Sequence, residues 1–358
     1  MATKKKNERQ STVAEAAPAS ENGRSNSELD HELLRSMLLQ RRFEERCAEA
    51  YALGKIGGFC HLYIGQEAVS TGVLSMLRPD DYVITTYRDH GQALARGIPP
   101  RAVMAELFGR VDGVVRGKGG SMHLFDRNVN FLGGHGIVGA HVPLGTGVAF
   151  AIKYRGGDQV CVCFMGESVV NTGAFHEALN MAGLWKLPIL YVIENNRYGM
   201  GTALERASAI HDIYERGASY NMQRAQCDGQ DVFAVRAATQ EALDRARREQ
   251  LPTLLEVRTY RFMGHSMSDA VSGTYRTKAE LDEHMKRDPI MLLRVHMQEN
   301  GELTDEELQN LDADIKAMVQ DAWDFADQSP EPPVEALYEH VYVDTTSDAT
   351  SQEAVAAD

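Results

Sequence analysis

The stretch CVCFMGESVVNTG, residues 161–173, decides the fold of this chain. Its first half has the apolar composition of a buried strand, and it ends at a glycine, a carboxylate and a hydroxyl group. Cys161 and Cys163 alternate along the strand, so we interpret them as small core residues and not as ligands. Residues 171–185, NTGAFHEALNMAGLW, then follow the period of a helix.

A second apolar run, LPILYVIEN at residues 187–195, follows this helix and is rich in β-branched residues. Strand, crossover helix and strand form a βαβ unit, whose two strands are parallel neighbours. Residues 81–91 indicate a strand that runs into a polar turn, and residues 253–261 indicate a further strand. Residues 28–54, 65–77 and 100–109 indicate helices. We therefore predict an α/β fold with a mainly parallel sheet flanked by helices.

The C-terminal third is predicted to be helical. Capping boxes, each a threonine followed three residues later by a glutamate, begin at Thr277 and Thr304. An apolar stripe on the last helix predicts core packing and consists of Leu308, Leu311, Ile315, Met318 and Ala322. Without a repeat or a central linker, we predict one domain over residues 31–345. Residues 1–30 and 346–358 have the polar composition of disordered tails.

Composition restricts the class of protein. A hydrophobic content of 43% over 358 residues allows a large core. The 37 Lys and Arg against 51 Asp and Glu give a net charge of −14, which repels nucleic acid and anionic membranes. No run approaches the roughly 18 apolar residues of a membrane span, and no secretory signal is visible. Five cysteines without a CxxC pair predict reduced thiols.

These features predict a bacterial-type cytoplasmic protein. The alternative is import into the mitochondrial matrix, which requires an arginine-rich transit peptide with few acidic residues. Glu8, Glu15 and Glu21 and the scarcity of arginine in the first 30 residues argue against that alternative.

Two glycine-rich stretches partly match nucleotide-binding patterns. GHGIVG, residues 134–139, fits the dinucleotide pattern GxGxxG, which must follow a strand and open a helix. Because residues 127–133 make a poor strand and Pro143 follows closely, we reject dinucleotide binding and expect a loop whose backbone approaches another group. In RGKGGS, residues 116–121, Gly119 stands where a P-loop requires Ser or Thr, so we reject that motif too.

Polar side chains follow both strands of the βαβ unit: Glu167 after the first and Asn196 after the second. Open α/β sheets bind ligands at these strand ends, and a carboxylate with an amide oxygen suits Mg²⁺ or Ca²⁺. A helix starting near Asn171 or Thr172 directs free N–H groups to the same crevice, so we predict a phosphorylated ligand. Spacing alone leaves an alternative open, in which Glu167 caps the helix and the asparagine turns the chain.

With its surroundings, this spacing resembles the thiamin diphosphate fingerprint. GFCHLYIGQEA (58–68), EALNMAGLWKLPILYVIENNRYGMGTALERA (177–207) and YRFMGHSMSD (260–269) resemble the α subunits of thiamin-diphosphate-dependent 2-oxo acid dehydrogenases, in particular those of pyruvate dehydrogenase. The resemblance covers residues 33–343 and implies a thiamin-diphosphate-binding fold. It also implies oxidative decarboxylation of pyruvate and transfer of the acetyl group to the lipoyl domain of dihydrolipoyl acetyltransferase, for acetyl-CoA synthesis.

The resemblance implies thiamin diphosphate and Mg²⁺ as cofactors. It makes Glu167, the Asn196 side chain and the Tyr198 backbone carbonyl the metal ligands. Residues that contact the rest of the cofactor are Tyr87, Arg88, Ser168 and Val169 at the diphosphate, and Gly136 and Val138 of GHGIVG at the aminopyrimidine ring.

His61 and His265 match the active-site histidines of the family. A single histidine is more often structural or on the surface, and it is the motif context that selects these two. His265 lies in a polar loop typical of segments that order over a ligand. The resemblance implies that it binds the cofactor-bound intermediate and the incoming lipoyl group.

The resemblance also implies a partner, because the glutamate that activates the cofactor in this family lies on a β subunit. This chain is too short for the single-chain form of the enzyme, so we expect two α and two β subunits. The family commonly has Gly-Asp-Gly where this chain has Gly166-Glu167-Ser168. Glutamate occurs there in branched-chain 2-oxo acid dehydrogenases, which stay an alternative, as do acetoin dehydrogenase and a non-catalytic homologue.

Overall fold

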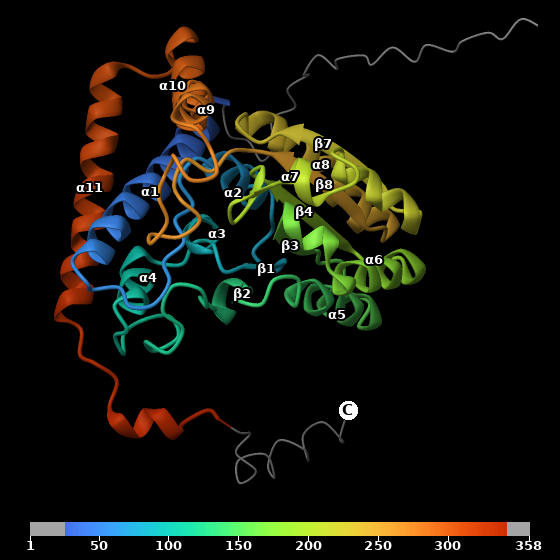
Figure 1. Ribbon diagram of the computed structural model, residues 1–358, viewed down its shortest axis with the longest axis horizontal. Helices are drawn as coiled ribbons and strands as arrows, with labels where there is room; N and C mark the ends of the chain where they lie inside the picture. Colours follow the sequence, from blue (N-terminus) through green and yellow to red (C-terminus); the bar gives the residue numbers. More distant parts are fainter. Residues whose placement is uncertain (1–25, 342–358) are drawn as a thin grey trace, which may run out of the picture.

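The structure is a computed structural model and describes residues 26–341. Its centre is a six-stranded, fully parallel sheet in the order β2-β1-β3-β4-β8-β7 (Figure 1). The strands are β1 (Tyr82–Thr86), β2 (Phe131–His135), β3 (Cys161–Gly166), β4 (Ile189–Asn195), β7 (Gln223–Asp228) and β8 (Thr253–Arg258). β3 and β4 are parallel neighbours joined by α6 (Gly173–Trp185), which confirms the βαβ unit and the α/β fold.

Side chains alternate along the strands and divide the core between the two faces of the sheet. Along β3, Val162 and Phe164 join one buried cluster, whereas Cys161, Cys163 and Met165 join the other. Both cysteines are free and buried, as predicted. The first cluster includes residues of α1 (Asn26–Ala52), α2 (Glu67–Leu74), α3 (His90–Arg96), α4 (Pro100–Leu107) and α8 (Val232–Glu249); the second includes residues of α5 (His141–Tyr154) and α6.

The C-terminal third is helical, as predicted, with α9 (Lys278–Met285), α10 (Pro289–Glu299) and α11 (Asp305–Gln328) followed by the 3₁₀ helix η4 (Val334–Tyr338). α11 packs along α1 and α4 (Figure 1). Short elements complete the described chain: β5 (Tyr198–Gly199), β6 (Thr202–Ala203), α7 (Leu204–Ala207) and the 3₁₀ helices η1 (Arg127–Val129), η2 (Glu167–Asn171) and η3 (Ile213–Tyr220). Over residues 26–341, no helix is both long and apolar enough for a membrane span.

One of the two predicted capping boxes is only half formed. At α11 the box is complete, with Thr304 and Glu307 bonding each other's backbone N–H groups. At α9, Thr277 accepts from the Glu280 backbone N–H at 3.1 Å, but the Glu280 carboxylate does not return the bond. It accepts instead from the hydroxyls of Tyr198 at 2.8 Å and Tyr260 at 2.9 Å. The prediction at Thr277 was therefore wrong for the glutamate, whose side chain fixes the segment after β4.

One element boundary differs from the prediction, and one strand was not predicted. α1 begins at Asn26, inside the segment 1–30 predicted to be a tail. The other residues of that segment, the predicted domain end at 345 and the tail 346–358 lie outside the described residues. β7 was not predicted, because its sequence QRAQCD lacks an apolar pattern; it is an edge strand that pairs with β8.

The GHGIVG segment does follow a strand and open a helix, so our reason for rejecting it was wrong. β2 ends at His135 and α5 begins at His141. Pro143 lies in the first turn of α5. Backbone N–H groups of a first turn have no hydrogen-bond partner within the helix, so a proline there removes no bond. Local geometry therefore does not separate this loop from a dinucleotide motif, and its ligand must be inferred from the residues around it.

The RGKGGS segment wraps around a carboxylate of the chain itself. Glu106 of α4 is fully buried, and its Oε2 atom accepts from the backbone N–H groups of Val115 and Gly117, both at 2.8 Å. Its Oε1 atom accepts from Gly119 at 2.7 Å and Gly120 at 3.1 Å. Gly117 has a φ of +76°, which a side chain would strain. The glycines thus form a nest for an internal anion.

Candidate active site

A cavity of about 640 Å³ opens at the carboxyl ends of β1, β3 and β4. β1 has β2 on one side and β3 on the other, so the order of the strands along the chain reverses here. Open α/β sheets bind ligands at such a reversal. The structure brings all the predicted site residues into the cavity wall: His61, Tyr87, Arg88, Gly136, Val138, Glu167, Ser168, Val169, Asn196, Tyr198 and His265.

The three predicted metal ligands all line the cavity. The Glu167 side chain is buried, and its Oε2 atom accepts from the Asn196 backbone N–H at 3.4 Å. Nη1 of Arg261 lies 3.5 Å from Asn196 Oδ1 and 3.3 Å from the Tyr198 carbonyl oxygen. Those two oxygens therefore face the same guanidinium nitrogen of the chain itself. Carboxylate, amide and backbone oxygens are the donor set that a hard divalent cation takes.

The helix predicted to begin near Asn171 or Thr172 is α6, which starts at Gly173 with Thr172 as its N-cap. The residues before it, from Glu167 to Asn171, form the 3₁₀ helix η2. Ser168 and Val169 of η2 line the cavity, and no residue of α6 does. The part of this crossover that reaches the cavity wall is therefore η2, and the prediction that the first residues of α6 face the ligand was wrong.

The two predicted histidines lie next to each other in the cavity wall. Ring centroids are 5.1 Å apart for His61 and His265, and Tyr87 lies 4.6 Å from the first and 5.8 Å from the second. The Arg88 guanidinium donates to the carbonyls of Leu62 at 2.6 Å and His265 at 2.8 Å, which ties the two histidine segments together. Burial, and next the Arg88 charge, lower the pKa of His61 to about 2 and that of His265 to about 4, so both are neutral at pH 7.

Three buried polar atoms of the wall have no hydrogen-bond partner within the described chain: Nδ1 of His61, Nδ1 of His265 and Nε2 of Gln66. Each such atom costs about 1–3 kcal/mol if nothing satisfies it. Their positions on one cavity indicate that a polar ligand completes them. A cavity lined by these oxygens and by free imidazole nitrogens fits a metal-bound cofactor with a polar substrate beside it.

Glu194 is a wall residue that the sequence analysis missed. It is buried at the end of β4, where it accepts from the Tyr63 hydroxyl and from Gln92 Nε2 at 2.9 Å. Burial raises its pKa to about 7. The available signal was a single acidic residue in an otherwise apolar strand.

Gln66 and Arg261 were also missed as wall residues. Gln66 Oε1 accepts from Asn196 Nδ2 at 3.1 Å and so orients that amide. Arg261 is 1% exposed and, besides its contacts at the predicted metal ligands, donates to the Met200 carbonyl at 3.2 Å. A buried arginine just after an apolar strand was the signal for Arg261, whereas nothing in the sequence marks Gln66 beyond the GQEA segment that contains it.

Two comparisons with known proteins show the family of this chain. Residues 35–335 match the family described as the dehydrogenase E1 component. The chain is 50% identical over 310 residues to the pyruvate dehydrogenase E1 component subunit alpha of Rhizobium meliloti (strain 1021), which covers 86% of this chain and 88% of the relative.

Proteins of the same name from other bacteria are similar. The subunit from Rickettsia bellii (strain RML369-C) is 46% identical over 309 residues, covering 86% of this chain and 94% of the relative. That from Zymomonas mobilis subsp. mobilis (strain ATCC 31821 / ZM4 / CP4) is 48% identical over 314 residues, covering 87% and 88%. The chain therefore belongs to the dehydrogenase E1 component family.

Proposed function

We propose that this chain is the α subunit of a pyruvate dehydrogenase E1 component and that it binds thiamin diphosphate through Mg²⁺. The observation that carries this proposal is that Glu167, Asn196 and Tyr198 line the same cavity as His61 and His265. The names of the relatives support pyruvate as the substrate.

In this proposal the chain clamps the cofactor at the strand ends. Glu167, the Asn196 side chain and the Tyr198 carbonyl would hold Mg²⁺, a hard cation that takes oxygen ligands from protein and phosphate groups. Further cofactor contacts come from Tyr87, Arg88, Ser168 and Val169 at the diphosphate, and from the backbones of Gly136 and Val138 at the ring. When bound, thiamin diphosphate supplies the electron sink for loss of CO₂ from a 2-oxo acid.

The two histidines work at the substrate end. Because burial keeps both imidazoles neutral, they add no charge to the site and offer their Nδ1 atoms for hydrogen bonding or proton transfer. Arg88 holds their backbones in place through the carbonyls of Leu62 and His265. His265 would then help to bind the reacting group and the incoming lipoyl group of dihydrolipoyl acetyltransferase.

A β subunit completes the site, in an assembly of two α and two β subunits located in the cytoplasm. Support for a covering partner comes from apolar side chains at the cavity: Phe59 is 62% exposed and Met200 63%, and both line it. Ile137, between the wall residues Gly136 and Val138, is 75% exposed. Apolar side chains around a polar site are typical of a surface that another subunit covers.

The test is turnover by the full-length chain assembled with its β subunit. With thiamin diphosphate and Mg²⁺, the assembly should release CO₂ from pyruvate and acetylate a lipoyl domain. An Asn196→Ala assembly is the control for background decarboxylation. Turnover of a branched 2-oxo acid but not of pyruvate would overturn the substrate assignment, and would connect Glu167 to the branched-chain enzymes. No turnover of any 2-oxo acid would favour a non-catalytic homologue.

A further inference from the structure

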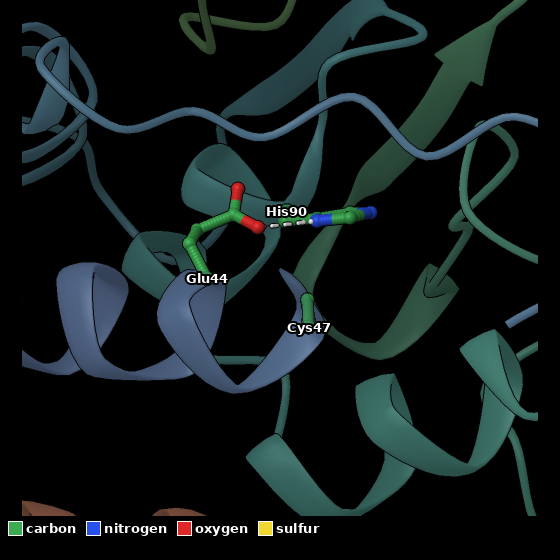
Figure 2. Close-up of side chains that lie close together, drawn as sticks. All are labelled: Glu44, Cys47 and His90. Atoms are coloured by element: carbon green, nitrogen blue, oxygen red, sulfur yellow. Dashed lines mark hydrogen bonds and ion pairs between the residues drawn. The ribbon is translucent and has the colours of Figure 1, made fainter. Parts of the chain in front are cut away.

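A cluster of three buried residues lies behind the cavity wall and takes no part in the mechanism above. Glu44 and Cys47 of α1 and His90 of α3 are at most 1% exposed, and their potential ligand atoms lie within 4.8 Å of one another. Figure 2 shows the Glu44 carboxylate directed at the His90 imidazole, with Cys47 nearby on the same helix as Glu44.

The hydrogen bonds of this cluster argue against a metal ion. Glu44 Oε2 lies 2.9 Å from His90 Nδ1, and Glu44 Oε1 accepts from the Tyr63 backbone N–H at 2.7 Å. His90 Nε2 reaches the carbonyl of Ser121 at 3.1 Å and its hydroxyl at 2.9 Å. Every oxygen and nitrogen of Glu44 and His90 side chains is thus already used.

These hydrogen bonds join three separate segments of the cavity wall. Tyr63 lies two residues after His61, and His90 two residues after Arg88. Ser121 is followed by Met122, another wall residue. Glu44 therefore connects the His61 segment to the Arg88 segment, and His90 connects the latter to the Met122 loop.

We propose that Glu44 and His90 are positioning residues, which fix the cofactor-binding Arg88 segment against the neighbouring His61 segment in the cavity wall. This inference rests on the proposed function, because it assigns the two segments to cofactor and substrate. Neither residue touches the cavity, so both act through the backbone that they hold. Side chains that orient binding groups from behind affect affinity strongly, because small displacements at a polar site are costly.

The two ring nitrogens of His90 are separable by substitution. In His90→Asn the amide nitrogen takes the place of Nδ1, which keeps the bond to Glu44 and loses that to Ser121. In His90→Gln the amide reaches the place of Nε2, which keeps Ser121 and loses Glu44. Glu44→Gln retains the shape of the side chain but offers only one acceptor oxygen to its two donors. Cys47→Ala is the matched control, because it empties space in the same cluster without removing any of these bonds.

The experiment measures thiamin diphosphate binding by calorimetry at saturating Mg²⁺, using each full-length variant assembled with the β subunit, together with kcat, KM and the unfolding midpoint. Glu44→Gln and both His90 variants should raise the Kd by about 10- to 100-fold. At saturating cofactor, kcat for pyruvate should also fall, because His61 is displaced. Cys47→Ala should lower the unfolding midpoint and leave the Kd unchanged.

Unfolding midpoints lowered in all four variants, with every Kd equal to that of the unmodified protein, would make the pair merely structural and overturn the proposal. Should the Glu44 and His90 variants fail to fold, Ser121→Ala removes a single contact and should raise the Kd roughly two- to tenfold; an unchanged Kd there also overturns it. An unmodified assembly that binds no thiamin diphosphate would overturn the proposed function itself, and this inference with it.

Discussion

Asn195 and Asn196 are adjacent at the end of β4, but their side chains line different cavities. Asn195 Nδ2 donates to Glu256 Oε1 at 2.7 Å in a cavity of about 460 Å³. Asn196 Nδ2 donates to Gln66 in the larger cavity. Because successive side chains of a strand point to opposite sides, this pair places a proposed metal ligand beside a residue of the same type that has none of its contacts.

The pair gives a matched test of the metal site. Asn196→Ala should weaken Mg²⁺-dependent binding of thiamin diphosphate by about 100-fold or more, since a direct oxygen ligand is lost. Asn195→Ala should leave that affinity unchanged and lower the free energy of unfolding by about 1–3 kcal/mol, because buried Glu256 loses a donor. Calorimetric titration and urea unfolding measure the two quantities. Unchanged affinity in Asn196→Ala would remove this residue from the ligand set.

Tyr198 is proposed to bind the metal through its backbone, so its side chain can be changed separately. Its hydroxyl donates to Glu280 at 2.8 Å. Tyr198→Phe keeps the carbonyl and the ring, and should cost about 1 kcal/mol of stability for one hydrogen bond. The Mg²⁺ dependence of cofactor binding should stay within about twofold of that of the unmodified protein. A tenfold loss would show that the hydroxyl, and not the carbonyl alone, matters at the metal.

The Glu106 carboxylate should be essential for the fold of the loop around it. Glu106→Gln replaces one oxygen by an NH₂ group that faces two backbone donors, so we expect a loss of about 2–4 kcal/mol in the free energy of unfolding. Glu299→Gln, on the surface of α10, is the control and should change stability by less than about 0.5 kcal/mol. Equal denaturation midpoints for the two variants would contradict the nest.

His141 should make the protein less stable in mild acid. Its Nε2 atom lies 2.8 Å from the Phe164 carbonyl, and burial lowers its pKa to about 4. From pH 6.5 down to 4 the unfolded chain binds a proton at this position and the folded chain does not. The shift of about 2.5 pH units corresponds to a loss of about 3 kcal/mol over that range.

Urea unfolding at pH 6.5 and pH 4.5 measures this effect. His141→Gln should lose less stability between the two values than the unmodified protein. Asp89→Asn should lose more, because burial raises the pKa of Asp89 to about 7, so that its folded form holds a proton that the unfolded form releases above pH 3.8. The same pH slope in all three proteins would contradict both assignments.

Sequence patterns were sufficient for the centre of the fold and for one side of the site. β3, α6 and β4 have apolar runs and a helical period of their own, so local composition alone indicates them. Glu167 and Asn196 could then be placed together, because strand ends of a βαβ unit meet at one edge. The resemblance to the family added the remaining site residues, and the cavity wall contains every one of them.

The rest depends on contacts between distant segments. The polar strand β7 is held by its pairing with β8, which its own composition does not encode. Gln66 reaches Asn196 across 130 positions of sequence. The Glu280 carboxylate does not form the expected bond to the Thr277 backbone N–H, because two tyrosine hydroxyls from another part of the chain donate to it. Local patterns carry no information about such partners.

The contact of Glu280 with the two tyrosine hydroxyls gives the C-terminal third a role at the site. Every residue of the cavity wall precedes Thr277, so a chain truncated there would retain the whole wall and the complete sheet. It would nevertheless lose the only acceptor that the structure gives the Tyr198 and Tyr260 hydroxyls within the described residues. The functional unit therefore extends beyond the cavity wall to Glu280, which holds Tyr198 and Tyr260. A minimal version of this protein has to include α9.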